Sequence, residues 1–532
     1  MPEERGTYYI TTPIYYASGK LHIGHAYSTV AADALARFKR MQGLKVRFLT
    51  GTDEHGQKIQ KRARQAGVAP QQFVDRIVQD ILHLWDVLHI SYDDFIRTTE
   101  ERHVKVVQEV VSKLWEQGDI YKSTYTGWYC VECESFWLPR QLQEGLCPDC
   151  GRELEKVTEE SYFFRMSRYA EPLLQHIRTH PEFIQPESRR NEVISFIEQG
   201  LEDLCISRTT FDWGVPIPWD RSHVVYVWLD ALSNYISAIG YTRDPDLFAA
   251  YWPADVHLVG KEIVRFHAII WPAVLMALGL PLPRQVFGHG WLVLEGGKMS
   301  KSKGNVVDPL VLVDRYGVDA VRHFLLREIP FGSDGTYSEE ALIARTNADL
   351  ANDLGNLVHR TLSMVERYLE GRIPVPGHLH RIDQELRETL AAAAAQVQRC
   401  MDELRISDAL ASIWEVVRAG NRYLDRTAPW SLFRHGDVER GGTVLYNVCE
   451  LIRITAVMLT PYLVDTPGKI WRRLGLEEDP GSITWAEVGE WGKLPPGLRV
   501  RSGEVLFPRI DERRAQSDGR PTSGRLPGGV GE

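Results

Sequence analysis

Two short motifs hold residues that could bind the phosphates of a nucleotide. His22-Ile-Gly-His25 lies where an expected strand passes into an expected helix, and imidazoles three positions apart point to one side of a helix start. The partial positive charge of a helix N-terminus also favours phosphate. Lys298-Met-Ser-Lys-Ser302 is a cationic segment near glycines that could fold over a pyrophosphate and neutralise developing charge. Each motif alone is also compatible with solvated surface residues.

Four of the seven cysteines form two closely spaced pairs. Cys130-x-x-Cys133 and Cys147-x-x-Cys150 are separated by 13 residues, a spacing typical of a four-thiolate zinc site. Four protein ligands complete a tetrahedral shell and leave no position for a substrate. We therefore expect one structural Zn²⁺ that orders an otherwise irregular segment. The alternative is four reduced thiols without metal.

The elements around the first motif are those of a parallel α/β sheet. Residues 7–14 are rich in Tyr, Ile and Thr, residues 24–41 carry apolar side chains at helical spacing, and residues 46–49 form a short apolar strand. Such sheets bind ligands at the C-terminal ends of their strands. Asp53, which closes the second strand, could therefore pair with a substrate ammonium. Its alternative role is to cap the helix that begins nearby.

Changes in pattern along the chain separate an α/β unit from an all-α unit. The predicted fold is a Rossmann-like parallel-sheet catalytic domain, split by a zinc-binding insertion and followed by a helical bundle. We expect the strand pattern to resume at 224–228 and again at 256–259. The predicted segments are the first sheet half 1–116, the insertion 117–222, the second sheet half 223–296, the cationic-loop connector 297–345, the bundle 346–510 and a disordered tail 511–532.

Composition excludes several classes of protein. With 532 residues, 44% hydrophobic and 25% charged, the chain is neither a collagen, nor mainly disordered, nor a disulfide scaffold. The N-terminus lacks the apolar core of a signal peptide, and prolines interrupt the longest uncharged run, 266–283. We therefore expect a buried helix there, no membrane span and a cytoplasmic protein. The net charge of -9 argues weakly against a nucleic-acid partner. However, residues 37–64 hold nine basic side chains against two acidic ones, and such patches govern binding.

The two phosphate motifs, about 270 residues apart and in this order, resemble the signature motifs of class I aminoacyl-tRNA synthetases. The resemblance extends to about residue 510. It is strongest for the methionyl family, which has segments similar to Pro13-Ile-Tyr-Tyr16 and Gly51-Thr-Asp-Glu-His-Gly56. It implies that ATP and L-methionine form methionyl-adenylate and pyrophosphate, with Mg²⁺ accompanying ATP. Methionine then passes to the 2′-hydroxyl of the terminal adenosine of initiator and elongator tRNA(Met).

Two aromatic stripes, at 228–235 and 263–271, each form one face of a helix and each follow an expected strand. Aromatic walls with one imidazole and one phenol suit a thioether, which is apolar, polarizable and a weak acceptor. On spacing alone, such stripes are more often ordinary core. The resemblance implies nine methionine contacts, namely Ile14, Tyr16, Asp53, Trp228, Ala231, Tyr235, Ile263, His267 and Trp271. Leu232 stands where some members of the family have proline.

Activation requires no protein base, because the methionine carboxylate is already ionised and attacks the α-phosphate directly. The tasks of the enzyme are in-line positioning and charge stabilisation. We assign the catalytic role to His22, His25, Lys298 and Lys301. The resemblance implies ATP contacts from His22, Gly24, His25, Lys298, Met299, Ser300, Lys301 and Ser302.

The helical region carries segments similar to the anticodon-binding elements of the methionyl family. Asn356 and Arg360 share a helix face, and Trp430 follows Pro429 at a helix boundary, where it can stay exposed for base stacking. Without the family context, solvated helix surface or core packing would explain these residues. With it, we expect all three to contact the CAU anticodon. The chain ends before the dimerising C-terminal domain of some members, which favours a monomer.

Three other functions compete with this assignment. A cysteine-specific synthetase would need a catalytic zinc near His22 or Asp53, where the sequence has no cysteine, and a leucine-specific one would need a much larger insertion. A non-catalytic RNA-binding protein would not need the histidines and lysines of the two motifs. Because the insertion has no room for an editing domain, we expect selectivity from the thioether fit or from editing within the synthetic site.

Overall fold

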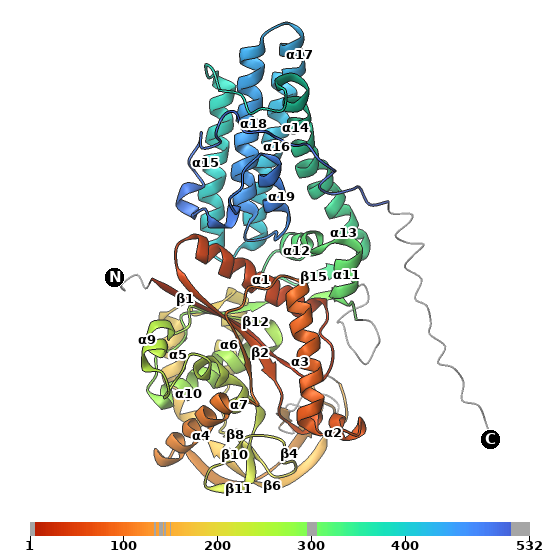
Figure 1. Ribbon diagram of the computed structural model, residues 1–532. Coiled ribbons are helices and arrows are strands. Elements are labelled where there is room, and N and C mark those ends of the chain that lie inside the picture. The colour runs from red at the N-terminus through yellow and green to blue at the C-terminus, as the bar shows by residue number, and fades with distance from the viewer. Residues whose placement is uncertain are drawn as a thin grey trace, which may run out of the picture.

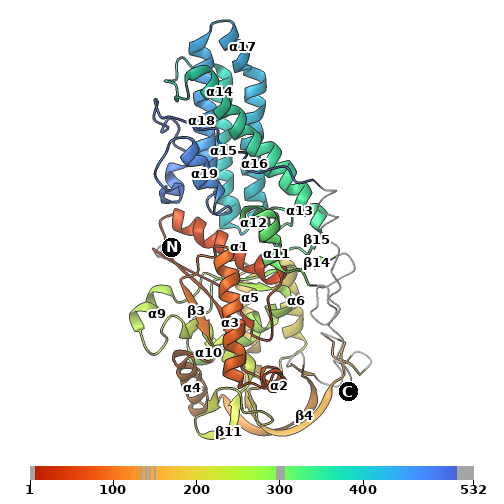
Figure 2. The same cartoon turned by 45° about the vertical axis from the view of Figure 1, so that its right-hand side comes forward.

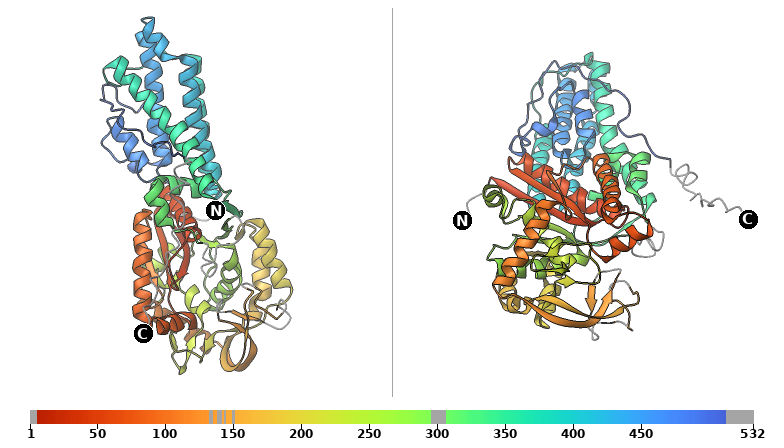
Figure 3. Two further views of the ribbon diagram at one scale, coloured as in Figure 1. Left: turned by 90° about the vertical axis from the view of Figure 1, so that its right-hand side faces the viewer. Right: turned by 60° about the horizontal axis from the view of Figure 1, so that its bottom comes forward.

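The computed structural model describes residues 6–131, 135–137, 142, 145–148, 151–294 and 306–511. These residues form a sheet domain, in the lower half of Figure 1, and a helical domain above it. The last third of the chain, coloured turquoise to blue, makes the upper helices, and Figures 2 and 3 show the same division from other sides. The predicted disordered tail lies, after residue 511, outside the described residues.

Six parallel strands form the central sheet of the lower domain. Their spatial order is β3-β2-β1-β12-β13-β7, and every neighbouring pair is parallel. The predicted parallel-sheet fold is therefore confirmed. The first two strands run further than predicted, to Tyr16 and Asp53, so that both residues end a strand. The strand bounds are β1 Thr7–Tyr16, β2 Lys45–Asp53, β3 Asp94–Arg97, β7 Ile184–Gln185, β12 Val256–Gly260 and β13 Val286–His289.

Helices cover both faces of this sheet because alternate strand residues point to opposite sides. Ile10 and Phe48 pack with α1 and α3 on one face, whereas Tyr9 and Leu49 pack with α4 and α10 on the other. The predicted helix at 24–41 is α1. The helix bounds are α1 Ile23–Met41, α2 Gln57–Gln65, α3 Pro70–Val87, α4 Glu101–Glu116, α5 Ala170–Thr179, α6 Glu187–Glu198, α7 Val227–Leu232, α8 Asn234–Ser237, α9 Pro245–Tyr251 and α10 Trp271–Leu278.

Two smaller sheets extend this domain away from the central one. β4 pairs over most of its length with β6 in the four-stranded sheet β5-β4-β6-β8, and β11 lies in the three-stranded sheet β10-β11-β9. The strand bounds are β4 Ile120–Cys130, β5 Ser135–Trp137, β6 Glu155–Phe164, β8 Leu204–Cys205, β9 Ser207–Arg208, β10 Pro216–Ile217 and β11 Asp220–Val225.

One predicted strand is wrong. The segment 224–228, expected to continue the α/β pattern, divides between β11, which is antiparallel to its neighbours, and α7, which begins at Val227. A short apolar run looks the same at a strand end and at a helix start, so its sequence cannot distinguish the two. In addition, β7 lies within the predicted insertion 117–222 but forms the outer strand of the central sheet. The domain boundaries stay a prediction.

A connector leads from the sheet domain to the helical bundle. From Glu339 the chain is helical to Leu369, through a π-helical segment at Thr346–Gly355, and the helical unit continues to α19 as predicted. The element bounds are β14 Leu292–Leu294, α11 Pro309–Tyr316, α12 Val318–Arg327, β15 Gly335–Tyr337, α13 Glu339–Arg345, α14 Asn356–Leu369, α15 Arg381–Asp402, α16 Ile406–Thr427, α17 Pro429–Arg434, α18 Val438–Leu459 and α19 Thr466–Arg473.

A buried ion pair joins the two domains. Arg322 of α12 donates to Asp33 of α1 at 2.7 Å, and both side chains are fully buried. The same guanidinium donates to the carbonyls of Leu88 and Tyr462 at 3.0 and 2.9 Å. Removing one partner of a buried pair costs about 3–5 kcal/mol, so these contacts hold the connector firmly on α1.

Two apolar helical segments are buried inside the protein. The helix predicted within 266–283 consists of a π-helical segment, Phe266–Ile270, and α10. Among the described residues, α18 is the one helix long and apolar enough to cross a membrane, and its apolar stretch is wholly buried in the bundle. A buried bundle helix has the same length and composition as a membrane span, so neither segment by itself indicates one.

Candidate active site

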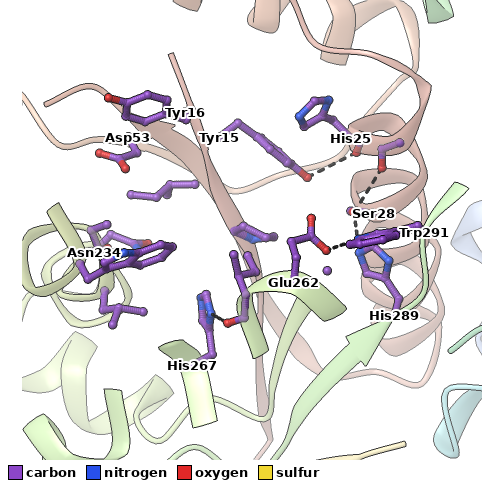
Figure 4. Close-up of a pocket in the computed structure, with 18 of the residues that line it drawn as sticks. Tyr15, Tyr16, His25, Ser28, Asp53, Asn234, Glu262, His267, His289 and Trp291 are labelled. Atoms are coloured by element: carbon purple, nitrogen blue, oxygen red, sulfur yellow. Dashed lines mark hydrogen bonds between the residues drawn. The ribbon is translucent and has the colours of Figure 1, made fainter. Parts of the chain in front are cut away.

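A pocket with a volume of about 380 Å³ lies at the C-terminal edge of the central sheet (Figure 4). The last residues of four strands line it: Tyr16 of β1, Asp53 of β2, Gly260 of β12 and His289 of β13. Parallel strands bring their C-terminal ends to one edge, which is why these residues, far apart in the sequence, meet. The pocket thus lies where a parallel sheet is expected to bind its ligands.

The histidines of the first phosphate motif lie at the N-terminus of α1 and line the same pocket. His22 Nδ1 accepts a hydrogen bond from the Gly24 N–H at 3.1 Å, and His25 Nδ1 accepts one from the His22 N–H at 3.0 Å. A neutral imidazole that accepts at Nδ1 carries its proton on Nε2. Both rings therefore cap the helix with one nitrogen and carry an N–H donor on the other, at the positive end of the helix dipole.

A buried aromatic wall forms another part of the pocket. His267 Nδ1 hydrogen-bonds the Ile263 carbonyl at 2.9 Å, so this nitrogen carries the proton, and His267 Nε2 accepts from the Tyr235 hydroxyl at 2.7 Å. Burial lowers the pKa of His267 to about 4 and raises the pKa of Tyr235, so both side chains are neutral near pH 7. The two polar hydrogens are thus engaged within the wall.

Eight of the nine predicted methionine contacts line the pocket. They are Ile14, Tyr16, Asp53, Trp228, Ala231, Tyr235, Ile263 and His267. The ninth, Trp271, is fully buried outside the lining, and its ring centroid lies 6.1 Å from that of Tyr235. The π-helical segment Phe266–Ile270 precedes Trp271, and a π turn takes one more residue than an α turn. The α-helical spacing assumed for this stripe therefore fails between His267 and Trp271, and Trp271 does not share the face that lines the pocket.

A buried carboxylate links the elements that carry the wall. Asp230 of α7 accepts from His55 Nδ1 at 2.7 Å and from His103 Nε2 at 2.8 Å, and His103 Nδ1 lies 2.8 Å from the Ser237 hydroxyl. Burial alone would raise the pKa of Asp230, but the adjacent imidazoles lower it to about 2, so the carboxylate is ionised. Because His55 lies two residues after Asp53, the network fixes the end of β2 relative to α7.

The sequence patterns missed several polar residues of the pocket lining. The Ser28 hydroxyl hydrogen-bonds His289 Nε2 at 2.6 Å, and Trp291 Nε1 donates to Glu262 at 2.6 Å. The side-chain oxygen of Asn234 is buried and has no hydrogen-bond partner among the described residues. Helical spacing from the predicted contacts could have identified Ser28 and Asn234, and His289 ends an apolar strand. No local pattern marks Trp291.

The predicted zinc cluster is only partly within the described residues. Cys130 is the last residue of β4, and Cys147 forms a turn in which its N–H donates to Arg152 O at 2.9 Å and its carbonyl accepts from Gly151 N–H at 2.8 Å. Both cysteines are buried. Where the structure describes the chain, no three His, Cys, Asp or Glu side chains gather as metal ligands. Outside the described residues lie Cys133, Cys150, Lys298, Met299, Ser300, Lys301 and Ser302.

The basic excess counted along residues 37–64 is partly neutralised in the fold. Within the described part of the chain, four of the nine basic side chains form ion pairs with aspartates that lie outside the segment. The pairs are Arg37–Asp33, Lys39–Asp402, Arg40–Asp93 and Arg47–Asp94. The local sum therefore overstates the charge that a nucleic acid would meet, because a count along the chain does not see partners contributed by other elements.

Family comparisons match nearly the whole chain. The family model for tRNA synthetases class I (M) matches residues 8–159 and 153–362, and that for the anticodon binding domain of methionyl tRNA ligase matches 373–524. The methionine–tRNA ligase of Caldanaerobacter subterraneus subsp. tengcongensis is 60% identical over 508 residues, which are 95% of this chain and 79% of that protein. The corresponding enzyme of Clostridium acetobutylicum is 55% identical over 511 residues, 96% of this chain and 79% of its own length.

A solved structure has the same architecture. Mycobacterium tuberculosis methionyl-tRNA synthetase in complex with methionyl-adenylate has a TM-score of 0.90 and 45% identity, and the match covers 94% of this chain and 100% of that one. The chain belongs to the methionyl-tRNA synthetase family. It is therefore a class I aminoacyl-tRNA synthetase, a methionine–tRNA ligase that binds methionine, ATP and tRNA.

In this synthetase the predicted anticodon residues lie on α14 and α17 of the helical domain. The Arg360 guanidinium lies 5.9 Å from the centroid of the Trp430 ring and donates to Asp425 at 2.9 Å. Asn356, exposed at the start of α14, lies one helical turn before Arg360 and on the same face. The fold thus brings Arg360 and Trp430 together and places Asn356 beside them on α14.

Proposed function

We propose that the pocket holds methionine and ATP side by side at the edge of the sheet. The Asp53 carboxylate, at the buried end of β2, binds the methionine ammonium, and the thioether lies against the wall of Tyr235 and His267. His22 and His25 bind the ATP phosphates at the start of α1. The observation that carries the proposal is that a carboxylate, an apolar wall and a helix N-terminus open into one cavity. The methionine set comprises Ile14, Tyr16, Asp53, Trp228, Ala231, Tyr235, Ile263 and His267, with Trp271 behind it.

In the activation step, the methionine carboxylate oxygen attacks the α-phosphorus of ATP, and the bond to the bridging oxygen of the leaving pyrophosphate breaks. His22 and His25 stabilise phosphate charge through their Nε2–H donors, and Lys298 and Lys301 neutralise the pyrophosphate. Mg²⁺ bound with ATP would supply further positive charge to offset that of the phosphates. The remaining ATP contacts are Gly24, Met299, Ser300 and Ser302.

The aromatic wall provides the selectivity for methionine. Because the Tyr235 and His267 hydrogens are engaged within the wall, a hydroxyl or charged side chain entering this part of the pocket would lose its water without gaining these donors. A thioether is only a weak acceptor and needs no such donor. Shape and polarizability of the ligand then decide which amino acid binds.

In the transfer step, the 2′-hydroxyl of the terminal adenosine of tRNA(Met) attacks the methionyl carbonyl, an ester forms and AMP leaves. The helical domain selects the tRNA by contacting the CAU anticodon. Trp430 stacks on a base, and Asn356 and Arg360 hydrogen-bond base edges. Initiator and elongator tRNA(Met) share this anticodon, so both are substrates.

We further propose one structural Zn²⁺, bound by Cys130, Cys133, Cys147 and Cys150. Thiolates are the ligands that such sites prefer, and two of these cysteines are buried, one of them in a turn closed by Gly151 at φ +69°. Bound zinc would supply a cross-link that orders this segment.

The synthetase acts as a cytoplasmic monomer.

ATP–pyrophosphate exchange across a panel of amino acids tests the proposed pocket. We expect methionine alone to raise exchange above the rate measured without amino acid. Exchange supported equally by leucine or cysteine would contradict the assigned wall, and its absence with methionine would contradict the placement of both substrates.

A further inference from the structure

We infer that the helical domain carries a second nucleotide-binding site, which takes a base of the tRNA anticodon loop outside the CAU triplet. The site consists of the side chains of Phe433, Tyr368 and Arg367, here named the Arg367 stack. It rests on the proposed function only in so far as α14 and α17 face the anticodon loop.

The Arg367 stack is built from two parallel rings and one cation. The rings of Tyr368 on α14 and Phe433 on α17 have centroids 4.6 Å apart and an interplanar angle of 7°. The Arg367 guanidinium lies over the Tyr368 ring, with its central carbon 5.3 Å from the centroid. Phe433 occupies one face of Tyr368, which leaves the other face for the guanidinium.

One end of the stack is closed by the backbone of α18. A Cβ at Gly441 would lie 2.9 Å from two carbons of the Phe433 ring, so the ring packs directly against a residue without a side chain. Nothing can be inserted at this end without displacing the ring. A further flat group can therefore join the stack only at the Arg367 end.

The Arg367 end is exposed, and its charge is not used within the described part of the protein. Arg360, two turns earlier on α14, donates to Asp425, whereas Arg367 forms no ion pair with any described residue. Its neighbour Glu366 instead accepts from the N–H and hydroxyl of Ser502 at 2.9 and 2.6 Å. A guanidinium supported by a ring and free of carboxylates can stack under a base or donate to a phosphate.

Helix geometry places the stack beside the proposed anticodon contacts. Arg360 and Arg367 are seven residues apart, so they share a face of α14 about 10 Å apart along its axis. Trp430 and Phe433 likewise both belong to α17. A single strand whose triplet lies on Trp430 and Arg360 would bring a flanking nucleotide to Arg367. A protein partner fits less well, because the outer layer is a cation on two half-buried rings rather than an apolar patch.

Binding of anticodon stem–loop RNA to the full-length protein tests the inference. Base stacking contributes about 1–3 kcal/mol, so we expect Arg367→Ala to weaken binding about tenfold. Arg367→Lys retains the charge but loses the flat donor group, so its affinity for the RNA should lie between those of the wild type and Arg367→Ala. Arg399→Ala removes an exposed arginine of α15 and should bind like the wild type. Binding by Arg367→Ala within twofold of wild type, or equal weakening by Arg399→Ala, would overturn the inference.

A series of stem–loops, each with one abasic nucleotide outside the triplet, locates the contact. At one loop position, the abasic substitution should weaken RNA binding by the wild type and by Trp430→Ala. The same substitution should not weaken binding by Arg367→Ala any further, because this variant already lacks the side chain that contacts the missing base. Additive losses at every position would contradict the stack. Weakened binding by Arg367→Ala with none by Trp430→Ala would instead contradict the proposed anticodon contact, so the two failures are distinguishable.

Discussion

The methionine pocket and the tRNA-facing side of α14 and α17 are built in opposite ways. In the pocket, Tyr235 and His267 are buried and hydrogen-bonded to each other at 2.7 Å, and behind them the buried Asp230 accepts from His55 and His103 at 2.7 and 2.8 Å. On the helices, Arg360 and Trp430 are partly exposed and meet in a cation–π contact at 5.9 Å. One site is a fixed enclosure and the other a solvated surface.

The difference follows from the two ligands. A small amino acid can be surrounded, so its walls can be ordered before it binds and little further ordering is needed. An RNA loop is contacted from one side and brings its own bases and charge, so single side chains on a surface suffice. Changes in the pocket should therefore alter catalysis by large factors, and changes on α14 and α17 should alter tRNA binding by smaller ones.

The largest effect should come from Asp53→Ala. Truncating one partner of a buried charge pair costs about 2–5 kcal/mol, so we expect kcat/KM for methionine in ATP–pyrophosphate exchange to fall about 10²-fold or more. The KM for ATP should change little. Asp53→Asn keeps an oxygen acceptor and should be less impaired. A loss below about fivefold in Asp53→Ala would show that the carboxylate does not bind the ammonium.

The next effect tests whether the buried network positions the pocket. An amide at position 230 has a donor in place of one of the two oxygens that accept from His55 and His103, so one imidazole must change its tautomer, turn or lose its partner. We expect Asp230→Asn to raise the KM for methionine about tenfold, leave the KM for ATP nearly unchanged and lower the thermal midpoint.

Asp349→Asn is the matched control for this variant. Asp349, in the π-helical segment Thr346–Gly355, accepts from the buried His323 of α12 at 3.0 Å, and neither residue lines the pocket. Its substitution should lower the thermal midpoint without changing the KM for methionine. If both variants shift this KM equally, or if Asp230→Asn shifts both KM values in proportion, Asp230 supports the fold alone.

Local patterns predict the edge of the sheet but not the networks behind it. Asp53 and His22 were identifiable because a strand end and a helix start are encoded within a few neighbouring residues. The pairing of His103 with Asp230 joins residues 127 positions apart, and that of Lys39 with Asp402 joins residues 363 apart. Hydrophobic periodicity carries no information about such distances, so these contacts were not predictable.

Departures from regular helix geometry limit the prediction in a second way. The stripe 263–271 assumes α-helical spacing throughout, and the π turn at Phe266–Ile270 breaks that assumption before Trp271. Nothing in the residues themselves distinguishes a π turn from an α turn. The pocket could therefore be predicted up to His267, whereas the position of Trp271 required the structure.

On the tRNA side, Trp430→Ala should impair charging but not activation. Loss of one stacked base corresponds to about 1–3 kcal/mol, so we expect the KM for tRNA(Met) in aminoacylation to rise about tenfold. Methionine-dependent exchange, which needs no tRNA, should stay within about twofold. Trp430→Phe retains a ring and should recover part of the loss. Equal damage to both activities would contradict an anticodon role.

The smallest expected effect concerns the response of the wall to pH. Burial lowers the pKa of His267 from 6.5 to about 4. Between these values the unfolded chain binds a proton at this position that the folded protein does not, so the free energy of unfolding decreases as the pH falls from 6.5 toward 4. Between pH 7.5 and 5.5, His267 should account for a loss of about 1 kcal/mol.

Urea unfolding at pH 7.5 and 5.5 gives the change in the free energy of unfolding for the wild type and for His267→Gln. The difference between these two changes measures the contribution of His267. The neighbouring His257 is also buried, and its pKa is lowered mainly by desolvation, which both proteins share, so most of its contribution cancels. His435→Gln, at an exposed residue that follows α17, should keep the pH dependence of the wild type. If His267→Gln keeps it as well, the imidazole titrates alike in the folded and unfolded chain. The wall would then be hydrated, and the contrast between a dry enclosure and a solvated surface would not hold.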